Sequence, residues 1–237
     1  KSSVRTRQLP GVSPLVFSRF LLEKTAFLSL SDMGKALPSY EEIPIACRMD
    51  EAVQSEYKRI ENALVRVLRS DRRAAQKILS AYLNLLTVYP DQPYDQKPIL
   101  YPDSDIPIVE PENIGGADTL GEKELQTLEI VKTAIQNGER ALIYTSWVRT
   151  DSQQKLKKLL TDEGYRTEIL TDKIKTTDRE DWVQKKLAAG MQVLIVNPSL
   201  VETGLDLNAF TTLVFYSMGY KLFTLRQASR RSWRINQ

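Results

Sequence analysis

The sequence predicts an α/β protein, in which a parallel sheet flanked by helices is preceded by a mainly helical segment and a Pro-rich linker. Short apolar runs alternate with helix-length amphipathic stretches from residue 122 to residue 237. Residues 1–89 instead repeat apolar side chains at helical spacing. Residues 90–121 hold six of the eleven prolines and the Gly115-Gly116 pair. We therefore expect a helical lead-in over 1–89, a linker over 90–121 and an α/β lobe over 122–237.

The lead-in segment contains three candidate helices. Ser13 is a candidate N-cap, with Pro14 at the first helical position of SPLVFSRFLLEKTAFLSL. Asp50 is the candidate N-cap of DEAVQSEYKRIENALVRVLRS, and a third helix is predicted in DRRAAQKILSAYLNLLTV. Before the second helix, EEIPIACRM is predicted to be a short extended segment in which Pro44 favours an edge position. The linker after these helices is predicted to be a long exposed loop.

The α/β lobe is predicted to contain four helices that alternate with four strands. Gly164 and Gly190 stand where helix C-terminal caps belong, and Thr177 or Asp178 is a candidate N-cap. The expected helices are Glu122–Asn137, Ser152–Glu163, Asp178–Ala189 and Leu222–Trp233. The expected strands are ALIYTS (141–146), YRTEIL (165–170), VLIVN (193–197) and TLVFYS (212–217). Buried-type strands that alternate with helices of this length favour a parallel sheet.

Composition excludes several classes of function. The chain has no histidine and one cysteine, so it has no internal disulfide, no His-dependent nucleophile and almost no zinc ligands. No apolar run approaches the ~20 residues that span a bilayer, and the basic first residues lack the apolar core of a signal peptide. We therefore expect no membrane partner and an intracellular location, in the cytoplasm, nucleoid or nucleus.

Charge is concentrated at the end of the chain. Net charge is only +3, yet residues 207–237 contain no acidic residue. On a helix, Gln227, Arg231 and Arg234 share one face, whereas Arg230 points elsewhere. Two arginines a turn apart are suited to bind phosphate oxygens through planar, bidentate hydrogen bonds. The alternative is a solvated surface helix whose arginines pair with acids.

Several segments resemble the motifs of Swi/Snf-like superfamily-two ATPases. QASRRSWRINQ is similar to motif VI of that family, which typically reads QAxxRxHRxGQ. VLIVNPSLVETGLDL resembles motif V, and RALIYTSWVRTDSQQKLKKLLTDEGYRTEIL resembles motif IV with its following helix and strand. Upstream, LPSYEEIPIACRMDEAVQSEYKRI is similar to the segment that leaves the first lobe of the family. The resemblance implies the second RecA-like lobe of a DNA-dependent ATPase, with its lead-in segment.

The resemblance also implies roles for particular residues. Arg231 and Arg234 match the arginine fingers that reach the γ-phosphate of ATP held by the first lobe. Gln227, Gly204 and Asp206 match positions on the nucleotide side of the cleft between lobes. Ser146, Trp147 and Thr203 match positions that face the DNA backbone. Such contacts let a motor hold DNA without reading its sequence.

Some residues depart from the family pattern. Val201 and Glu202 stand where the family often has a glycine pair, and a carboxylate there would repel a phosphate. Trp233 replaces the usual histidine of motif VI and Asn236 the usual glycine, but neither change removes an arginine.

Parts of a complete motor are missing from the sequence. Gly116 and Gly121 have the spacing of a phosphate loop, but Glu122-Lys123 follow in place of Lys-Ser/Thr, and no apolar strand precedes them. We therefore expect ATP and Mg²⁺ to be bound mainly by a first lobe outside this chain. We further expect that the chain is a fragment of a larger protein and that it hydrolyses no ATP alone.

Three other functions remain open at this stage. The first alternative is the lobe of a helicase or restriction-type translocase that acts on single strands or RNA. A catalytically inactive nucleic-acid-binding module is a second alternative. The third, a nucleotide-sugar or dinucleotide enzyme, lacks the expected GxGxxG after a first strand. No metal site is expected in this chain.

Overall fold

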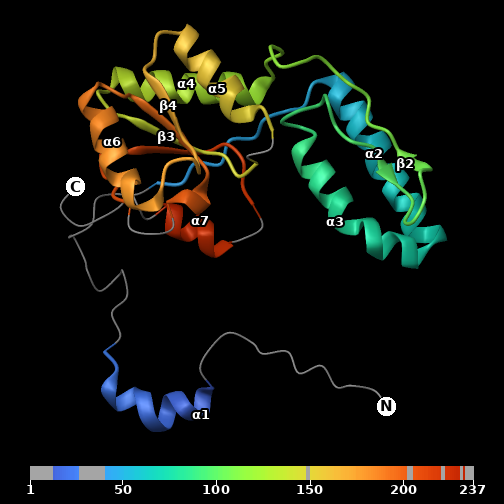
Figure 1. The fold of residues 1–237 in the computed structure, drawn as a ribbon, viewed down its shortest axis with the longest axis horizontal. Coiled ribbons are helices and arrows are strands. Elements are labelled where there is room, and N and C mark those ends of the chain that lie inside the picture. Colours follow the sequence, from blue (N-terminus) through green and yellow to red (C-terminus); the bar gives the residue numbers. More distant parts are fainter. Residues whose placement is uncertain are drawn as a thin grey trace.

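The computed structural model describes residues 13–26, 41–147, 150–201, 205–219, 222–229 and 232. Over these residues the chain forms a helical unit and an α/β lobe (Figure 1). The candidate N-cap Ser13 precedes α1 (Pro14–Val16), which continues into the short turns η1 (Phe17–Leu21) and η2 (Leu22–Lys24). None of these turns buries a residue. No helix in the described ranges is both long and apolar enough to cross a bilayer.

The helical unit consists of α2 (Glu51–Ser70), α3 (Arg72–Val88), β1 (Ile99–Leu100) and β2 (Pro107–Val109). The apolar stripes of α2 and α3 face each other, and Ile60 and Tyr82 are fully buried between them. Asp71 caps α3, since its carboxylate accepts from the backbone N–H groups of Arg73 and Ala74. Asp50 stands at the N-cap of α2 as expected, but its side chain makes no capping bond.

The Pro-rich segment is not the exposed loop that its composition predicts. Strands β1 and β2 pair antiparallel, and Ile99 and Val109 are buried in the core of α2 and α3. Arg59 of α2 donates to the carbonyl of Glu110 at 2.6 Å, and Tyr89 donates through its hydroxyl to the carbonyl of Glu112 at 2.8 Å. Apolar burial and these bonds therefore fix the segment to the helices. EEIPIACRM, in contrast, forms no strand.

The lobe is a four-stranded, fully parallel sheet with helices on both faces. The strand order is β4-β5-β3-β6, with β3 (Ala141–Tyr144) and β5 (Val193–Val196) in the centre. Strands β4 (Thr167–Leu170) and β6 (Thr212–Phe215) form the edges. The predicted parallel α/β class is confirmed.

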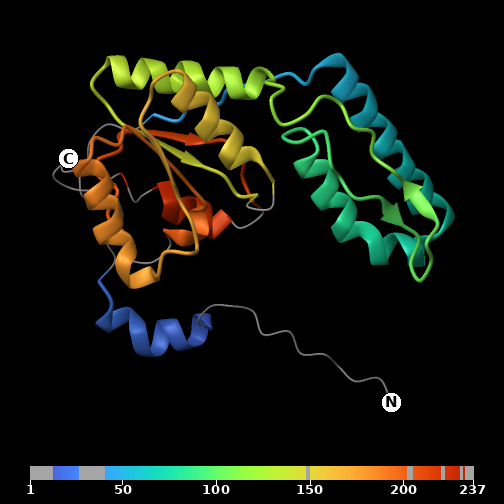
Figure 2. The ribbon, with the colours of Figure 1, turned by 45° about the horizontal axis from the view of Figure 1, so that its top comes forward.

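Alternate residues of the central strands serve two different cores. Ala141 and Ile143 pack with α4 (Glu122–Gln136) and α5 (Ser152–Asp162), whereas Leu142 and Tyr144 pack against the other face. Helices α6 (Arg179–Ala188) and α7 (Leu222–Ser229) cover that second face (Figure 2). Because side chains alternate along a strand and both faces are covered, these strands are apolar throughout.

Glycines end two of these helices as the sequence predicts. Gly164 follows α5 with a φ of +88°, and Gly190 follows α6 with a φ of +89°. A Cβ at Gly190 would lie 2.2 Å from a guanidinium nitrogen of Arg166. The left-handed backbone favours glycine there, whereas the exposed Arg166 side chain could move away from an added Cβ.

Candidate functional site at the carboxyl edge of the sheet

The carboxyl ends of the four strands form the edge where a parallel sheet usually binds its ligands. Ser146 and Trp147 leave β3 at this edge, and Asn197 leaves β5. The short helix η5 (Pro198–Leu200) follows β5, and Ser217 follows β6. The structure thus brings together loops that are up to 71 residues apart in the chain.

Hydrogen bonds hold three of these loops together. The N–H of Ser146 donates to the Ser217 hydroxyl at 2.8 Å, and the Ser146 hydroxyl donates to the Ser217 carbonyl at 2.9 Å. The Asn197 amide donates to the Ser146 carbonyl at 3.1 Å. We call Ser146, Asn197 and Ser217 the edge latch. Ser146 is a predicted site residue, whereas Asn197 and Ser217 are not, because their only signal in the sequence is a polar residue after an apolar run.

Asn197 also shapes the turn that follows it. Its side-chain oxygen accepts from the backbone N–H of Ser199 at 2.9 Å and from the Ser199 hydroxyl at 2.6 Å. An asparagine that bonds the backbone two residues ahead forms a local turn, which here starts η5. Asn197 therefore connects the turn after β5 to the loop after β3.

Tyr144 anchors α7 to the sheet. Its ring is fully buried and stacks on Phe215 of β6, with ring centroids 5.0 Å apart. Its hydroxyl donates to the carbonyl of Ala228 at 3.0 Å. Gln227, a predicted nucleotide-side residue, precedes Ala228 and is half-buried. The role of Tyr144 is not predictable from the sequence, because a bond between residues 84 positions apart leaves no local signal.

Asp206 lies on the loop between β5 and β6. Its backbone N–H donates to the Glu180 carboxylate of α6 at 2.9 Å, and its own carboxylate accepts from the Asn208 N–H at 3.2 Å. The side chains on either side, Leu205 and Leu207, are buried in the same core as Ala228. Asp206 and Gln227 are thus sequence neighbours of residues that pack in the same apolar core.

Four of the predicted site residues lie outside the residues that the structure describes. These are Thr203, Gly204, Arg231 and Arg234. The described helix α7 ends at Ser229, two residues before Arg231, so the end of the predicted helix to Trp233 is also outside. Of the site predicted from sequence, the structure therefore locates Ser146, Trp147, Asp206 and Gln227.

A buried charged cluster joins the lobe to the helical unit beside this edge. The Glu124 carboxylate of α4 accepts from the Lys155 ammonium of α5 and from the Tyr216 hydroxyl, both at 2.8 Å. Burial and then the Glu124 carboxylate raise the pKa of Tyr216 far above its ordinary value, so its hydroxyl remains a donor. Lys123 bonds the buried Asp91 carboxylate at 2.5 Å and lies 4.3 Å from the centre of the Tyr216 ring.

Contacts of the same cluster show that the segment from Gly116 to Gly121 is not a phosphate-binding loop, although its two glycines have the spacing of one. Glu122 stands where such a loop has its lysine, and Lys123, at the Ser/Thr position, is paired with Asp91. Gly121 instead provides the N-cap of α4, where its N–H donates to the Glu124 carboxylate at 3.0 Å. The described part of this segment is thus suited to joining two units of the protein and unsuited to holding ATP phosphates. Within the described ranges, no three His, Cys, Asp or Glu residues gather as metal ligands.

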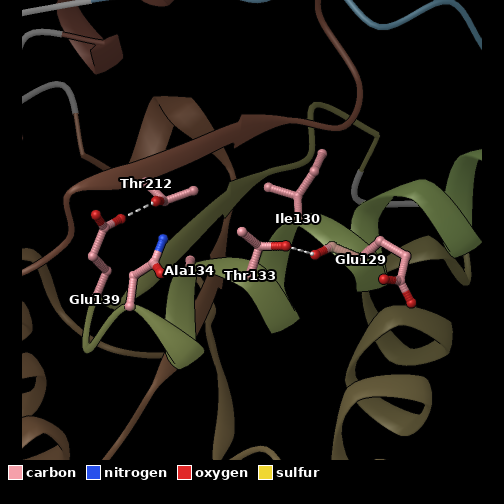
Figure 3. Close-up of a pocket in the computed structure, with 7 residues that line it drawn as sticks. Glu129, Ile130, Thr133, Ala134, Glu139 and Thr212 are labelled. Carbon is pink, nitrogen blue, oxygen red and sulfur yellow. Dashed lines mark hydrogen bonds between the residues drawn. The ribbon is translucent and has the colours of Figure 1, made fainter.

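A surface pocket lies at the opposite end of the sheet. It is lined by residues of α4, of the turn after it and of the start of β6: Glu129, Ile130, Thr133, Ala134, Asn137, Glu139 and Thr212 (Figure 3). The Thr212 hydroxyl donates to the Glu139 carboxylate at 2.6 Å. Because Thr212 begins β6, this pocket is at the amino ends of the strands and contains no predicted site residue.

Comparison with known proteins identifies relatives of this arrangement. Residues 123–236 match the family model of the helicase conserved C-terminal domain. The C-terminal part of the Fun30 ATPase domain has a TM-score of 0.59 at 14% identity, over 85% of this chain and 82% of that chain. The Sulfolobus solfataricus SWI2/SNF2 ATPase C-terminal domain has a TM-score of 0.54 at 17% identity, over 72% and 68% of the two chains. No curated protein sequence matches the chain. The RecA-like fold expected from the sequence is confirmed.

Proposed function

We propose that the chain is the second motor lobe of a Swi/Snf-like ATPase that translocates on duplex DNA, because residues 123–236 match the family model of the helicase conserved C-terminal domain. The family match is the observation that carries this proposal. It is supported by the polar loops of the edge latch, which lie where a parallel sheet binds its ligands.

Arg231 and Arg234 are the proposed arginine fingers. An arginine that contacts the transferring phosphoryl group stabilises charge that develops in the transition state, which contributes roughly 10³–10⁵ in rate. The bond from Tyr144 to Ala228 supports this role, because it fixes α7, the helix that leads to both arginines. Gln227, Gly204 and Asp206 would lie on the nucleotide side of the same cleft.

ATP and Mg²⁺ would be held mainly by a first lobe, since Lys123 and Gly121 are engaged in structural contacts. When bound, they supply the phosphoryl group and the metal that offsets its charge. The residues of this chain would contribute donors to the bound nucleotide from the opposite side of the cleft. We therefore expect this chain alone to hydrolyse no ATP.

Ser146, Trp147 and Thr203 are the proposed contacts to the DNA backbone. The Ser146 hydroxyl proton is engaged by the Ser217 carbonyl, so Ser146 would act by setting the shape of the edge and through its remaining lone pair. Trp147 follows directly and is half-buried. Its fluorescence should fall on addition of duplex DNA, whereas an unchanged signal would place the DNA elsewhere.

Two other functions use the same lobe. A helicase or restriction-type translocase acting on single strands or RNA would place a different nucleic acid on the same edge. A catalytically inactive binding module would bind nucleic acid without turnover. Hydrolysis assays with duplex DNA, single-stranded DNA and RNA distinguish the duplex translocase from a helicase or translocase that acts on single strands or RNA. Absence of hydrolysis with all three nucleic acids indicates the inactive binding module.

The sharpest test of the arginine fingers is Arg231→Ala in a protein that contains both lobes. Hydrolysis should fall by roughly 10³–10⁵, while ATP binding changes little, because the finger acts on the transition state. Arg230→Ala is the matched control, since helical spacing points Arg230 away from the face shared by Gln227, Arg231 and Arg234. Equal loss of nucleotide affinity in Arg231→Ala would mean that the arginine is structural.

A further inference from the structure

Four exposed arginines lie at the end of α2 and the start of α3, on either side of the turn at Asp71. We call Arg66, Arg69, Arg72 and Arg73 the arginine tip. Residues 62–80 contain these arginines, Lys77 and a single acid, Asp71, which gives a net charge of 5 − 1 = +4. The Asp71 carboxylate is occupied in capping α3, and Lys77 pairs with Asp103.

The arginine tip is not paired with acids in the part of the chain that the structure describes. None of its four guanidinium groups lies within ion-pair distance of a described carboxylate, and Arg66 bonds only the carbonyl of Asn62 of its own helix. Arg72 and Arg73 occupy the first two positions of α3. The positive end of the helix dipole disfavours cations there. Their placement therefore weakens the helix slightly, and a ligand is a better explanation for it than stability.

The position of the arginine tip relates it to the carboxyl edge of the sheet. Helix α3 has 17 residues, which at 1.5 Å per residue span about 26 Å. Gln92 follows the carboxyl end of α3. Its side-chain oxygen accepts from the N–H of Asp151, in the loop after β3, at 2.9 Å. The start of α3, which carries Arg72 and Arg73, is thus about one helix length from the end that lies near the loop after β3. Figure 1 shows α3 extending away from the lobe.

We propose that the arginine tip is a second contact to the phosphate backbone of the same duplex. This inference rests on the proposed function. Guanidinium groups bind phosphate oxygens in a bidentate manner and remain charged at any physiological pH. A helical turn of B-DNA is about 34 Å long, so one duplex can lie on the carboxyl edge and reach the arginine tip within a single turn. The contact would be independent of sequence, since it involves phosphates alone.

The test compares the unaltered chain with the triple variant Arg69→Gln, Arg72→Gln and Arg73→Gln. Binding to a fluorescent 20-base-pair duplex is measured by anisotropy between about 50 and 200 mM salt. Removal of three phosphate contacts should weaken binding roughly tenfold and reduce the slope of log affinity against log salt by about two to three. Arg140→Gln is the matched control, because Arg140 is an exposed arginine at the amino end of β3.

A short duplex makes the test specific for a second contact. A hairpin with about 6 base pairs is roughly 20 Å long at 3.4 Å per pair, too short to reach from the carboxyl edge to the arginine tip. The triple variant should therefore bind the short hairpin as well as the unaltered chain does. Equal loss of affinity for both lengths would overturn the proposal of two separated contacts.

Other outcomes separate this inference from the proposed function. If the unaltered chain binds duplex and the triple variant binds it equally well, the arginine tip is no DNA contact and the proposed function stands. If the unaltered chain binds no duplex, the arginine tip is no DNA contact, whereas hydrolysis by a protein that contains both lobes still decides the proposed function. Full duplex affinity in a variant that has lost binding to poly-glutamate would assign the arginine tip to an acidic protein partner, and so overturn the proposal.

Discussion

The helical unit and the lobe bury their apolar side chains in different ways. In the helical unit, α2 and α3 each bury one stripe and leave the rest of the helix in water. In the lobe, helices cover both faces of the sheet, so residues such as Leu142 and Ile143 are buried on opposite sides. The strands of the lobe are therefore enclosed on both faces, whereas α2 and α3 each expose one side to solvent along their length.

The two units have separate apolar cores and meet through polar contacts. The described contacts between them include the Lys123–Asp91 ion pair, the bond from Asp151 to Gln92 and the bond from the Arg48 N–H to Glu122. Burial raises the pKa of Asp91, and Lys123 partly offsets this effect. A polar junction of this kind predicts that each core determines the stability of its own unit.

The largest expected effect comes from the buried ion pair next to this junction. Lys155→Met should destabilise the lobe by about 3–5 kcal/mol, because it leaves the Glu124 carboxylate buried without its cation. Lys158→Met, on the same helix, should cause no measurable change, since Lys158 and its partner Asp118 are exposed. Urea unfolding followed by tryptophan fluorescence measures both variants. Equal effects of the two substitutions would contradict the importance of the buried pair.

A second pair of substitutions tests whether the cores are separate. Ile143→Ala in the lobe and Ile60→Ala in the helical unit each remove side-chain volume from a fully buried position. Each should cost about 2–5 kcal/mol in its own unit. All three tryptophans, at positions 147, 182 and 233, lie outside the helical unit, so their fluorescence reports on the lobe.

Tryptophan fluorescence and far-ultraviolet circular dichroism should therefore report different unfolding midpoints for these two variants. Ile143→Ala should shift the unfolding midpoint seen by tryptophan fluorescence. Ile60→Ala should shift only the component of far-ultraviolet circular dichroism that comes from the helical unit. If Ile60→Ala shifted the fluorescence midpoint as much as Ile143→Ala does, the two units would unfold as one.

The smallest effect concerns the acid stability of the helical unit. Burial opposes ionisation of Glu56, but bonds from Arg59 and from the Glu112 N–H prevail, so the pKa of Glu56 lies below its ordinary 4.5. A depressed pKa contributes stability above pH 4.5 that is lost as the pH falls through the folded value. Glu56→Gln should cost about 1–2 kcal/mol at pH 7, and less at pH 3.

Circular dichroism during urea unfolding at the two pH values measures this change. Glu61→Gln, on the exposed face of the same helix, is the control. If Glu56→Gln cost as much at pH 3 as at pH 7, the carboxylate would have no part in the acid sensitivity of the unit.

Much of the lobe was predictable because its signals are local. The helix from Glu122, the caps at Gly164 and Gly190 and the four strands all follow from periodicity and turn residues a few positions apart. The ends of the strands differ from the prediction by one or two residues, because pairing stops before the chain bends at polar residues such as Ser146.

The remaining features depend on contacts between distant residues. The edge latch joins residues 51 and 71 positions apart, and the bond from Tyr144 to Ala228 joins residues 84 apart. Prolines predicted an exposed linker, but Ile99 and Val109 found apolar partners on α2 and α3, which the local composition does not reveal. Lys155 occupies a position on α5 that sequence alone would assign to the surface, and Glu124 and Tyr216 enclose it.

The most direct test of the motor-lobe proposal is ATP hydrolysis by a protein that contains both lobes, measured without nucleic acid and with duplex DNA, single-stranded DNA or RNA. Strong stimulation by duplex DNA alone, abolished by Arg231→Ala and retained by Arg230→Ala, is the predicted result. Absence of hydrolysis with every nucleic acid would contradict the proposal and leave a nucleic-acid-binding module as the function of the lobe.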